Sequence, residues 1–275
     1  MRRLDADVGP AMDPPAEVAG RLLPRYVFER VTIGESGAGV WRCTSDDSPP
    51  VYLKAGPRSA GLQLDQEADR LRWMEEHDLP VPAVGDYGRI GSTEFLLLEE
   101  VPGLAASEPQ WTSCLPEVIS ALAAGLALLH RTSIVDCPFD QRIARQIDAA
   151  RHRVAAGRVR EDDFDEIRAG RRATDLLGEL LSSVPADEDL VFTHGDFCLP
   201  NIILDRGPTG EIQIAGLVDC GRAGIADRYQ DLALAVRSIS YNFGGVWVAP
   251  FFHAYGLPRP QEEKLRFFTL LDEFF

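Results

Sequence analysis

The densest group of side chains capable of chemistry lies between His194 and Asp219. Within it, Asp196 is followed by Asn201 five residues later and by Asp219 twenty-three residues later, at the end of an apolar β-type run. Oxygen ligands from Asn201 and Asp219 suit a hard divalent cation such as Mg²⁺, and Asp196 could orient and deprotonate a hydroxyl nucleophile beside it. Each residue alone could instead be a turn residue that caps a strand, but the ordered set favours this chemistry.

A second group, nearer the N-terminus, could hold a polyphosphate. The loop Gly34-Glu35-Ser36-Gly37-Ala38-Gly39 lies between two candidate strands, where backbone N–H groups and the Ser36 hydroxyl could approach phosphate oxygens. Lys54 ends a later β-type run and could reach the same phosphates, and Glu67 on the following helix is placed to fix its ammonium group. An ordinary hairpin turn and two surface charges are the alternatives, although the apolar residues around Lys54 argue against simple exposure.

The elements that must position these residues differ between the two halves of the chain. Short β-type runs separated by turn signals predict a small antiparallel sheet, with strands at 26–32, 39–43, 51–54 and 95–98. Apolar residues at three- and four-residue steps predict one helix within it, at 64–77. Residues 1–20 carry three prolines among charges, which predicts a loose lead-in rather than a packed element.

After Val101-Pro102-Gly103 the pattern becomes helical, with apolar periodic stretches at 118–129, 176–181, 232–239 and 265–271. Two β-like patches interrupt it, one at 190–193 and one made of the pair 201–205 and 212–219. We therefore predict an α+β fold: a small N-terminal lobe at 21–100 with an antiparallel sheet plus one helix, a hinge at 101–105, and a larger, mostly helical C-terminal lobe at 106–275. Ligands are expected between two such lobes.

The composition excludes some classes of partner. The 275 residues include 28 Lys and Arg against 43 Asp and Glu, a formal net charge of −15, which argues against nucleic acid because its binding depends on cationic side chains. The charge suits either a cationic partner or plain solubility. Neither a secretion signal nor a membrane span is apparent, and the five cysteines lack C-x-x-C spacing. We expect a cytoplasmic protein with reduced thiols.

These motifs together resemble the protein-kinase-like aminoglycoside 3'-phosphotransferases, the bacterial kanamycin and neomycin kinases. The resemblance runs from about Tyr26 to Phe275 and includes three further segments: Leu129-His130 with Cys137-Pro138-Phe139, the stretch 224–232, and the terminal Leu271-Asp272-Glu273-Phe274-Phe275. It implies a bilobal protein-kinase-like fold and transfer of the γ-phosphoryl group of ATP, with GTP as a possible second donor and Mg²⁺ as cofactor, to an aminoglycoside 3'-hydroxyl. Antibiotic resistance would follow, with no obligate protein partner.

Carried over by matching position, the resemblance implies a role for each motif residue. Asp196 would be the catalytic base, Asn201 and Asp219 would bind Mg²⁺, and Lys54 would contact the α- and β-phosphates with Glu67 as its partner. The remaining nucleotide contacts would come from the loop with Ser36 and Gly37, from stacking of adenine on Tyr52, and from the backbone near Glu99 and Val101.

An aminoglycoside is polycationic at neutral pH, so several carboxylates should face its site. The resemblance places the side chains of Asp272 and Glu273 and the terminal carboxylate of Phe275 there, with Arg222 on the same side. A frayed terminus is the alternative, but a tail that ends in two aromatic residues should dock. Asp162 and Asp163, with Asp165 and Glu166 beyond them, are further candidates that could equally form a solvated helix face or a charge arrangement at a helix N-terminus.

One departure from the family pattern concerns Ser240-Tyr241-Asn242, which stand where relatives commonly carry an acidic residue. This departure puts in doubt the range of amino sugars that carry an additional charged ring. His194 is expected to bond backbone near the catalytic loop rather than carry protons, and no further ligands accompany His194 and Cys198 to make a zinc site. Two other functions stay open: a kinase of another small hydroxylated metabolite, and a nucleotide-binding pseudokinase that acts as an interaction module.

Overall fold

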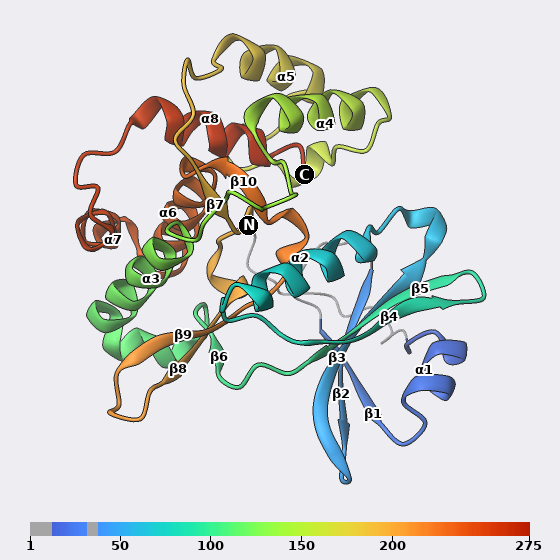
Figure 1. Ribbon diagram of the computed structural model, residues 1–275. Coiled ribbons are helices and arrows are strands. Elements are labelled where there is room, and N and C mark those ends of the chain that lie inside the picture. Colours follow the sequence, from blue (N-terminus) through green and yellow to red (C-terminus); the bar gives the residue numbers. More distant parts are fainter. Residues whose placement is uncertain (1–12, 32–37) are drawn as a thin grey trace. The chain divides into compact units, whose positions relative to one another are not determined.

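The structure, a computed structural model, describes residues 13–31 and 38–275 and divides them into two compact units (Figure 1). The smaller unit holds the described residues up to Leu104 together with Ala215–Gly221. The larger unit holds Ala105–Ile214 and Arg222–Phe275. Ser36 and Gly37, expected at the phosphates, lie outside the described residues.

The smaller unit is built on a five-stranded antiparallel sheet in the order β1-β2-β3-β5-β4. Helix α2 packs against β4 and β5. The prediction of an antiparallel sheet with one such helix is confirmed, but β4 was missed because three of its seven residues are Gly or Asp, which obscure the alternation of apolar and polar residues. The strands are β1 (Val27–Val31), β2 (Gly39–Ser45), β3 (Ser48–Pro57), β4 (Val84–Ile90) and β5 (Thr93–Glu99), and α2 spans Leu64–Glu76.

One further helix, α1 (Ala16–Leu22), corrects the expectation of a loose lead-in through residue 20. Val18 of this helix is completely buried in a cluster with apolar residues of the sheet, among them Trp41 and Leu53. The prediction of a loose lead-in rested on the prolines that precede this helix. The helix forms nonetheless because one of its faces is buried against the sheet.

The larger unit is mostly helical, as predicted. Its helices pair as α3 with α7, α6 with α8 and α4 with α5, and short strands form a β7–β10 pair and a three-stranded sheet β6-β8-β9 (Figure 1). The helices are α3 (Leu115–Leu129), α4 (Ile143–Ala155), α5 (Ala173–Ser182), α6 (Tyr229–Phe243), α7 (Val248–Tyr255) and α8 (Glu262–Asp272). The strands are β6 (Leu104–Ala105), β7 (Leu190–Thr193), β8 (Ile202–Arg206), β9 (Ile212–Leu217) and β10 (Gly224–Asp227).

Within the described residues, one helical stretch, Pro109–Leu129, is long and apolar enough to cross a membrane by length and composition. It contains α3, whose Val118, Leu122 and Leu126 are buried and which packs against α7. A core helix of a folded domain passes the same test of length and composition, and this packing accounts for the apolar face.

Candidate active site

Lys54 is the centre of a buried ion-pair group in the smaller unit. Its Nζ lies 2.6 Å from Oε1 of Glu67 and 2.9 Å from Oδ1 of Asp219. Strand β3 brings Lys54 to the sheet, helix α2 carries Glu67, and Asp219 follows β9. Burial opposes the charge of Lys54, but the two carboxylates prevail and raise the pKa of its ammonium group. The pairing expected between Lys54 and Glu67 is therefore present, and Asp219 joins it.

Asp219 has an unusual backbone. Its φ is +60°, in the left-handed region that non-glycine residues seldom adopt and that is often found at functional sites. Strand β9, which precedes Asp219, packs closely against Val101 at Gly216. A Cβ on Gly216 would come within 2.5 Å of the Val101 side chain. The carboxylate is 42% exposed, so it can contact Lys54 and still meet a ligand.

Asp196 lies in the loop between β7 and β8 of the larger unit. Its Oδ2 accepts a hydrogen bond from Nδ2 of Asn201 at 2.9 Å, and its main-chain carbonyl accepts one from the same amide group at 3.2 Å. Gly195, just before it, has φ of +84°, and a Cβ there would approach the Arg222 carbonyl oxygen to 2.2 Å. A side chain at position 195 would therefore force this loop away from Arg222.

Asp231, in the first turn of α6, holds the backbone of the same loop. Its carboxylate is completely buried and accepts the N–H groups of His194 and Gly195, each at 2.8 Å. The Asp196 N–H in turn donates to Nδ1 of His194 at 3.2 Å. His194 thus bonds the backbone of the loop, the structural role expected from the sequence, and its ring presents Nδ1 as an acceptor.

The residues expected around adenine all belong to the smaller unit. Tyr52 on β3 is half-buried, and burial together with the nearby Glu100 raises the pKa of its hydroxyl. Arg42 forms a bidentate pair with Glu100, at 2.5 and 3.1 Å, beside the same ring. The N–H of Glu99 donates to the Ala83 carbonyl at 3.0 Å, so this N–H is used within the smaller unit.

The acidic tail docks and is balanced by arginines that the sequence analysis largely overlooked. Asp272 at the end of α8 receives Arg222 on Oδ1 at 2.8 Å and Arg237 on Oδ2 at 2.5 Å. Burial opposes its ionisation, yet the two guanidinium groups lower the pKa of its carboxyl. Nη2 of Arg222 is buried and is one of two side-chain atoms without a hydrogen-bond partner among the buried groups of the described residues.

Glu273 is held just as tightly. Its carboxylate pairs with Arg168 at 3.3 Å and lies 3.8 Å from Arg237, while it accepts the N–H of Asp165 at 3.1 Å. Burial and the neighbouring Asp165 raise the pKa of Glu273 to about 7. Arg168 also pairs with the Asp165 side chain, so one guanidinium group bridges two carboxylates.

The last two residues are fixed as well. Phe274 is buried, and its carbonyl accepts Nε of Arg153 at 2.5 Å, while Nη2 of Arg153 reaches the Phe275 carbonyl at 3.2 Å. The Phe275 ring lies beneath the guanidinium group of Arg222, with 4.8 Å between Cζ and the ring centre. The tail therefore does not fray.

Asp162 and Asp163 are placed differently. Both are exposed in the short turn Glu161–Asp163, where Asp163 pairs with Arg160 at 2.5 Å. The structure brings Asp165, not these two residues, to Glu273. Arg168 and Arg237 could have been anticipated on physical grounds, because buried carboxylates of a docked tail need cationic partners.

The two residues expected to bind Mg²⁺ belong to different units, Asn201 to the larger and Asp219 to the smaller. Within the described part of the chain, no group of three His, Cys, Asp or Glu side chains is arranged as a metal site. The Asn201 amide N–H donates to Asp196, and its amide oxygen is a hard donor of the kind that suits Mg²⁺. The Asp219 side chain is 42% exposed, and its carboxylate is a hard oxygen donor as well.

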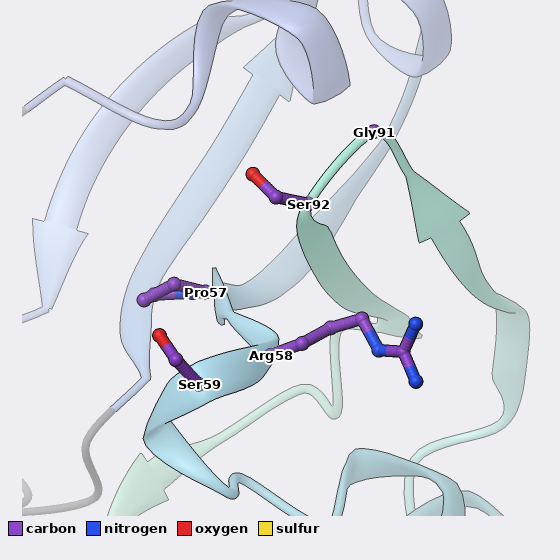
Figure 2. A pocket seen from close by; sticks show the side chains of 5 residues that line it. All are labelled: Pro57, Arg58, Ser59, Gly91 and Ser92. Atoms are coloured by element: carbon purple, nitrogen blue, oxygen red, sulfur yellow. The ribbon is translucent and has the colours of Figure 1, made fainter.

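A hollow of the smaller unit lies apart from these residues, lined by Pro57, Arg58, Ser59, Gly91 and Ser92. Figure 2 shows that the Arg58 guanidinium group points away from the Ser59 and Ser92 hydroxyls. Polar groups that diverge do not converge on one ligand, so this hollow adds no candidate residues.

Comparisons with known proteins show which family this chain resembles over most of its length. A model of the phosphotransferase enzyme family matches residues 27–268. The aminoglycoside 3'-phosphotransferase of Streptomyces fradiae is 39% identical, over 93% of this chain and 97% of the relative. The solved aminoglycoside-3'-phosphotransferase of type VIII has a TM-score of 0.79 and 39% identity, covering 90% of this chain and 94% of its own. The phosphotransferase APH(3'')-Id from Streptomyces rimosus, in complex with ADP and streptomycin, gives 0.76 and 29%, covering 90% and 92%.

Proposed function

We infer the function from one fact: the chain belongs to the phosphotransferase enzyme family. It is an ATP-dependent kinase that transfers the γ-phosphoryl group to the 3'-hydroxyl of an aminoglycoside and thereby confers resistance to that antibiotic. Relatives 39% identical over most of the chain carry this proposal. Two polar groups are consistent with it: Asp196 with Asn201, and Lys54 with Glu67 and Asp219.

Asp196 is the catalytic base. It accepts the proton of the attacking 3'-hydroxyl, and the hydrogen bond from Asn201 fixes the orientation of its carboxylate. The transition state of phosphoryl transfer is loose and spreads charge over the phosphoryl oxygens, so most of the catalysis comes from positioning and from nearby cations. Lys54 supplies such a cation to the α- and β-phosphates, and Glu67 keeps it in place.

Asn201 and Asp219 would hold Mg²⁺, which neutralises charge on the phosphates when it is bound. Tyr52 stacks on adenine, and the main chain at Glu99 and Val101 reads the base edge. Relatives solved with ADP support the use of a nucleotide. ATP is the donor in this proposal, and GTP is the alternative to be tested.

The acceptor side consists of Asp272, Glu273 and the terminal carboxylate of Phe275, with Asp162 and Asp163 as weaker candidates at its edge. Arg222 offers its buried Nη2 as a donor to an acceptor oxygen. Nucleotide binding is assigned to residues 21–100 and acceptor binding to residues 106–275, with a hinge at 101–105. We place the enzyme in the cytoplasm, without nucleic-acid, membrane or obligate protein partners.

A coupled assay of ADP release with kanamycin tests the proposal, and a 3'-deoxy aminoglycoside is the matched control. Turnover of kanamycin without turnover of the 3'-deoxy compound supports both the substrate class and the position. Turnover of choline or homoserine alone would favour a metabolite kinase. Nucleotide binding without any turnover would favour a pseudokinase.

A further inference from the structure

A chain of hydrogen bonds leads from the end of α7 to the buried Asp231 carboxylate. Oδ2 of Asp231 lies 3.1 Å from Nε2 of His130, at the end of α3. Nδ1 of the same ring lies 2.6 Å from the hydroxyl of Tyr255, the last residue of α7. Nη1 of Arg228 donates to that hydroxyl at 3.0 Å. All of these residues belong to the larger unit.

The direction of each hydrogen bond follows from what the groups can do. Arg228 can only donate, so the Tyr255 oxygen accepts from it and the Tyr255 proton remains available for Nδ1 of His130. Nδ1 accepts that proton when the ring carries its single proton on Nε2. This proton faces Asp231, an anionic carboxylate that can only accept. The Asp231 end of the chain therefore requires a proton on Nε2, and the Tyr255 end is compatible with that tautomer.

Arg228 is itself held in place. Its Nε and Nη2 bind the Asp189 carboxylate at 2.5 and 3.0 Å, which leaves Nη1 directed at Tyr255. Arg228 thus occupies one acceptor position of the Tyr255 oxygen and leaves the Tyr255 proton available to His130.

We propose that Tyr255 is a positioning residue for catalysis: held by Arg228, it fixes His130 as the neutral tautomer with its proton on Nε2. His130 then supplies the third N–H donor to Asp231, after those of His194 and Gly195. A completely buried carboxylate keeps one orientation only while all its donors are in place. Through Asp231, Tyr255 sets the backbone that presents Asp196.

Nitrogen-15 NMR of the wild-type protein tests the tautomer without any variant. We expect His130 to show one protonated nitrogen, Nε2, at neutral pH. A ring protonated on Nδ1, alone or together with Nε2, would overturn the proposal. This result is independent of whether the protein phosphorylates aminoglycosides.

Tyr255→Phe tests the consequence for catalysis, which rests on the proposed function. Loss of one buried hydrogen bond should lower kcat about three- to tenfold while KM for ATP and for kanamycin stay within about twofold. Tyr87→Phe removes a part-buried tyrosine hydroxyl that donates to Glu94 at 2.7 Å in the smaller unit; it is the matched control and should leave kcat unchanged.

The thermal midpoint of each variant separates positioning from stability. A lower midpoint in Tyr255→Phe with unchanged kcat at 25 °C would make Tyr255 purely structural and contradict the proposal. If the wild-type protein turns over no aminoglycoside, the proposed function fails instead, and the NMR result still decides the tautomer.

Discussion

The Asp272 carboxylate lies 2.8 Å from the guanidinium group of Arg222. Asp272 comes from the acidic tail, whereas Arg222 follows the turn that begins at Asp219. Electrostatic attraction from Asp272 and, more weakly, from Asp196 raises the pKa of Arg222 against the effect of burial. Within the larger unit, Arg222 therefore interacts electrostatically with both the tail and the proposed catalytic base.

Asp196→Ala should lower kcat by about two to four orders of magnitude, because it removes the group that accepts the hydroxyl proton. The side chain is only half-buried, so the variant should unfold at nearly the wild-type temperature. Steady-state kinetics and a thermal melt measure both quantities. A kcat close to that of the wild type would refute the assignment of Asp196 as the base.

Deletion of Phe275 should raise KM for kanamycin about tenfold and leave KM for ATP nearly unchanged, since its ring lies on Arg222 and its main-chain oxygen accepts from Arg153. Deleting Phe274 as well should also lower the thermal midpoint, because that side chain is completely buried. Equal changes in KM for both substrates would show that the tail is only structural.

Glu273 should make the protein less stable as pH rises. Its folded-state pKa, about 7, lies above the ordinary value of 4.5, so the folded protein binds more protons than the unfolded chain between these values. Its contribution is therefore most favourable below pH 4.5 and is lost as pH rises through 7. Thermal melts from pH 5 to about 8 measure this slope.

Glu273→Gln should remove that part of the slope, and it separates the contribution of Glu273 from the pH dependence of the rest of the protein. An unchanged slope in Glu273→Gln would assign the pH dependence to a different group.

Arg168→Gln should lower KM for kanamycin about three- to tenfold, because an acceptor ammonium group could then occupy the place of a cation between Asp165 and Glu273. Arg171→Gln is the matched control, since Arg171 pairs instead with Glu179 in a more exposed position. A higher KM in Arg168→Gln would mean that Arg168 organises the site instead of competing with the acceptor.

Residues close in sequence or set by regular periodicity were predictable. The helix with Glu67 and the strand with Lys54 follow from local patterns, and their ion pair is present. The contact between Lys54 and Asp219 joins residues 165 positions apart, and no local pattern reports such a separation. The structure also adds Ala215–Gly221 to the smaller unit, whereas the sequence placed these residues in the C-terminal lobe.

The acidic tail shows the other limit of prediction. Its carboxylates were recognised from the sequence, but Arg168 and Arg237 lie on separate elements and become their partners only through tertiary packing. Net charge likewise averages over the whole chain, and it conceals that the tail carboxylates are locally neutralised.

The left-handed backbone of Asp219 carries a consequence for the evolution of this chain. A non-glycine residue with φ of +60° is less stable there than glycine, by about 1 kcal/mol or more. Selection for a durable fold alone would therefore replace this carboxylate by glycine. Asp219 therefore lowers the stability of the folded protein locally, while its carboxylate lies beside Lys54.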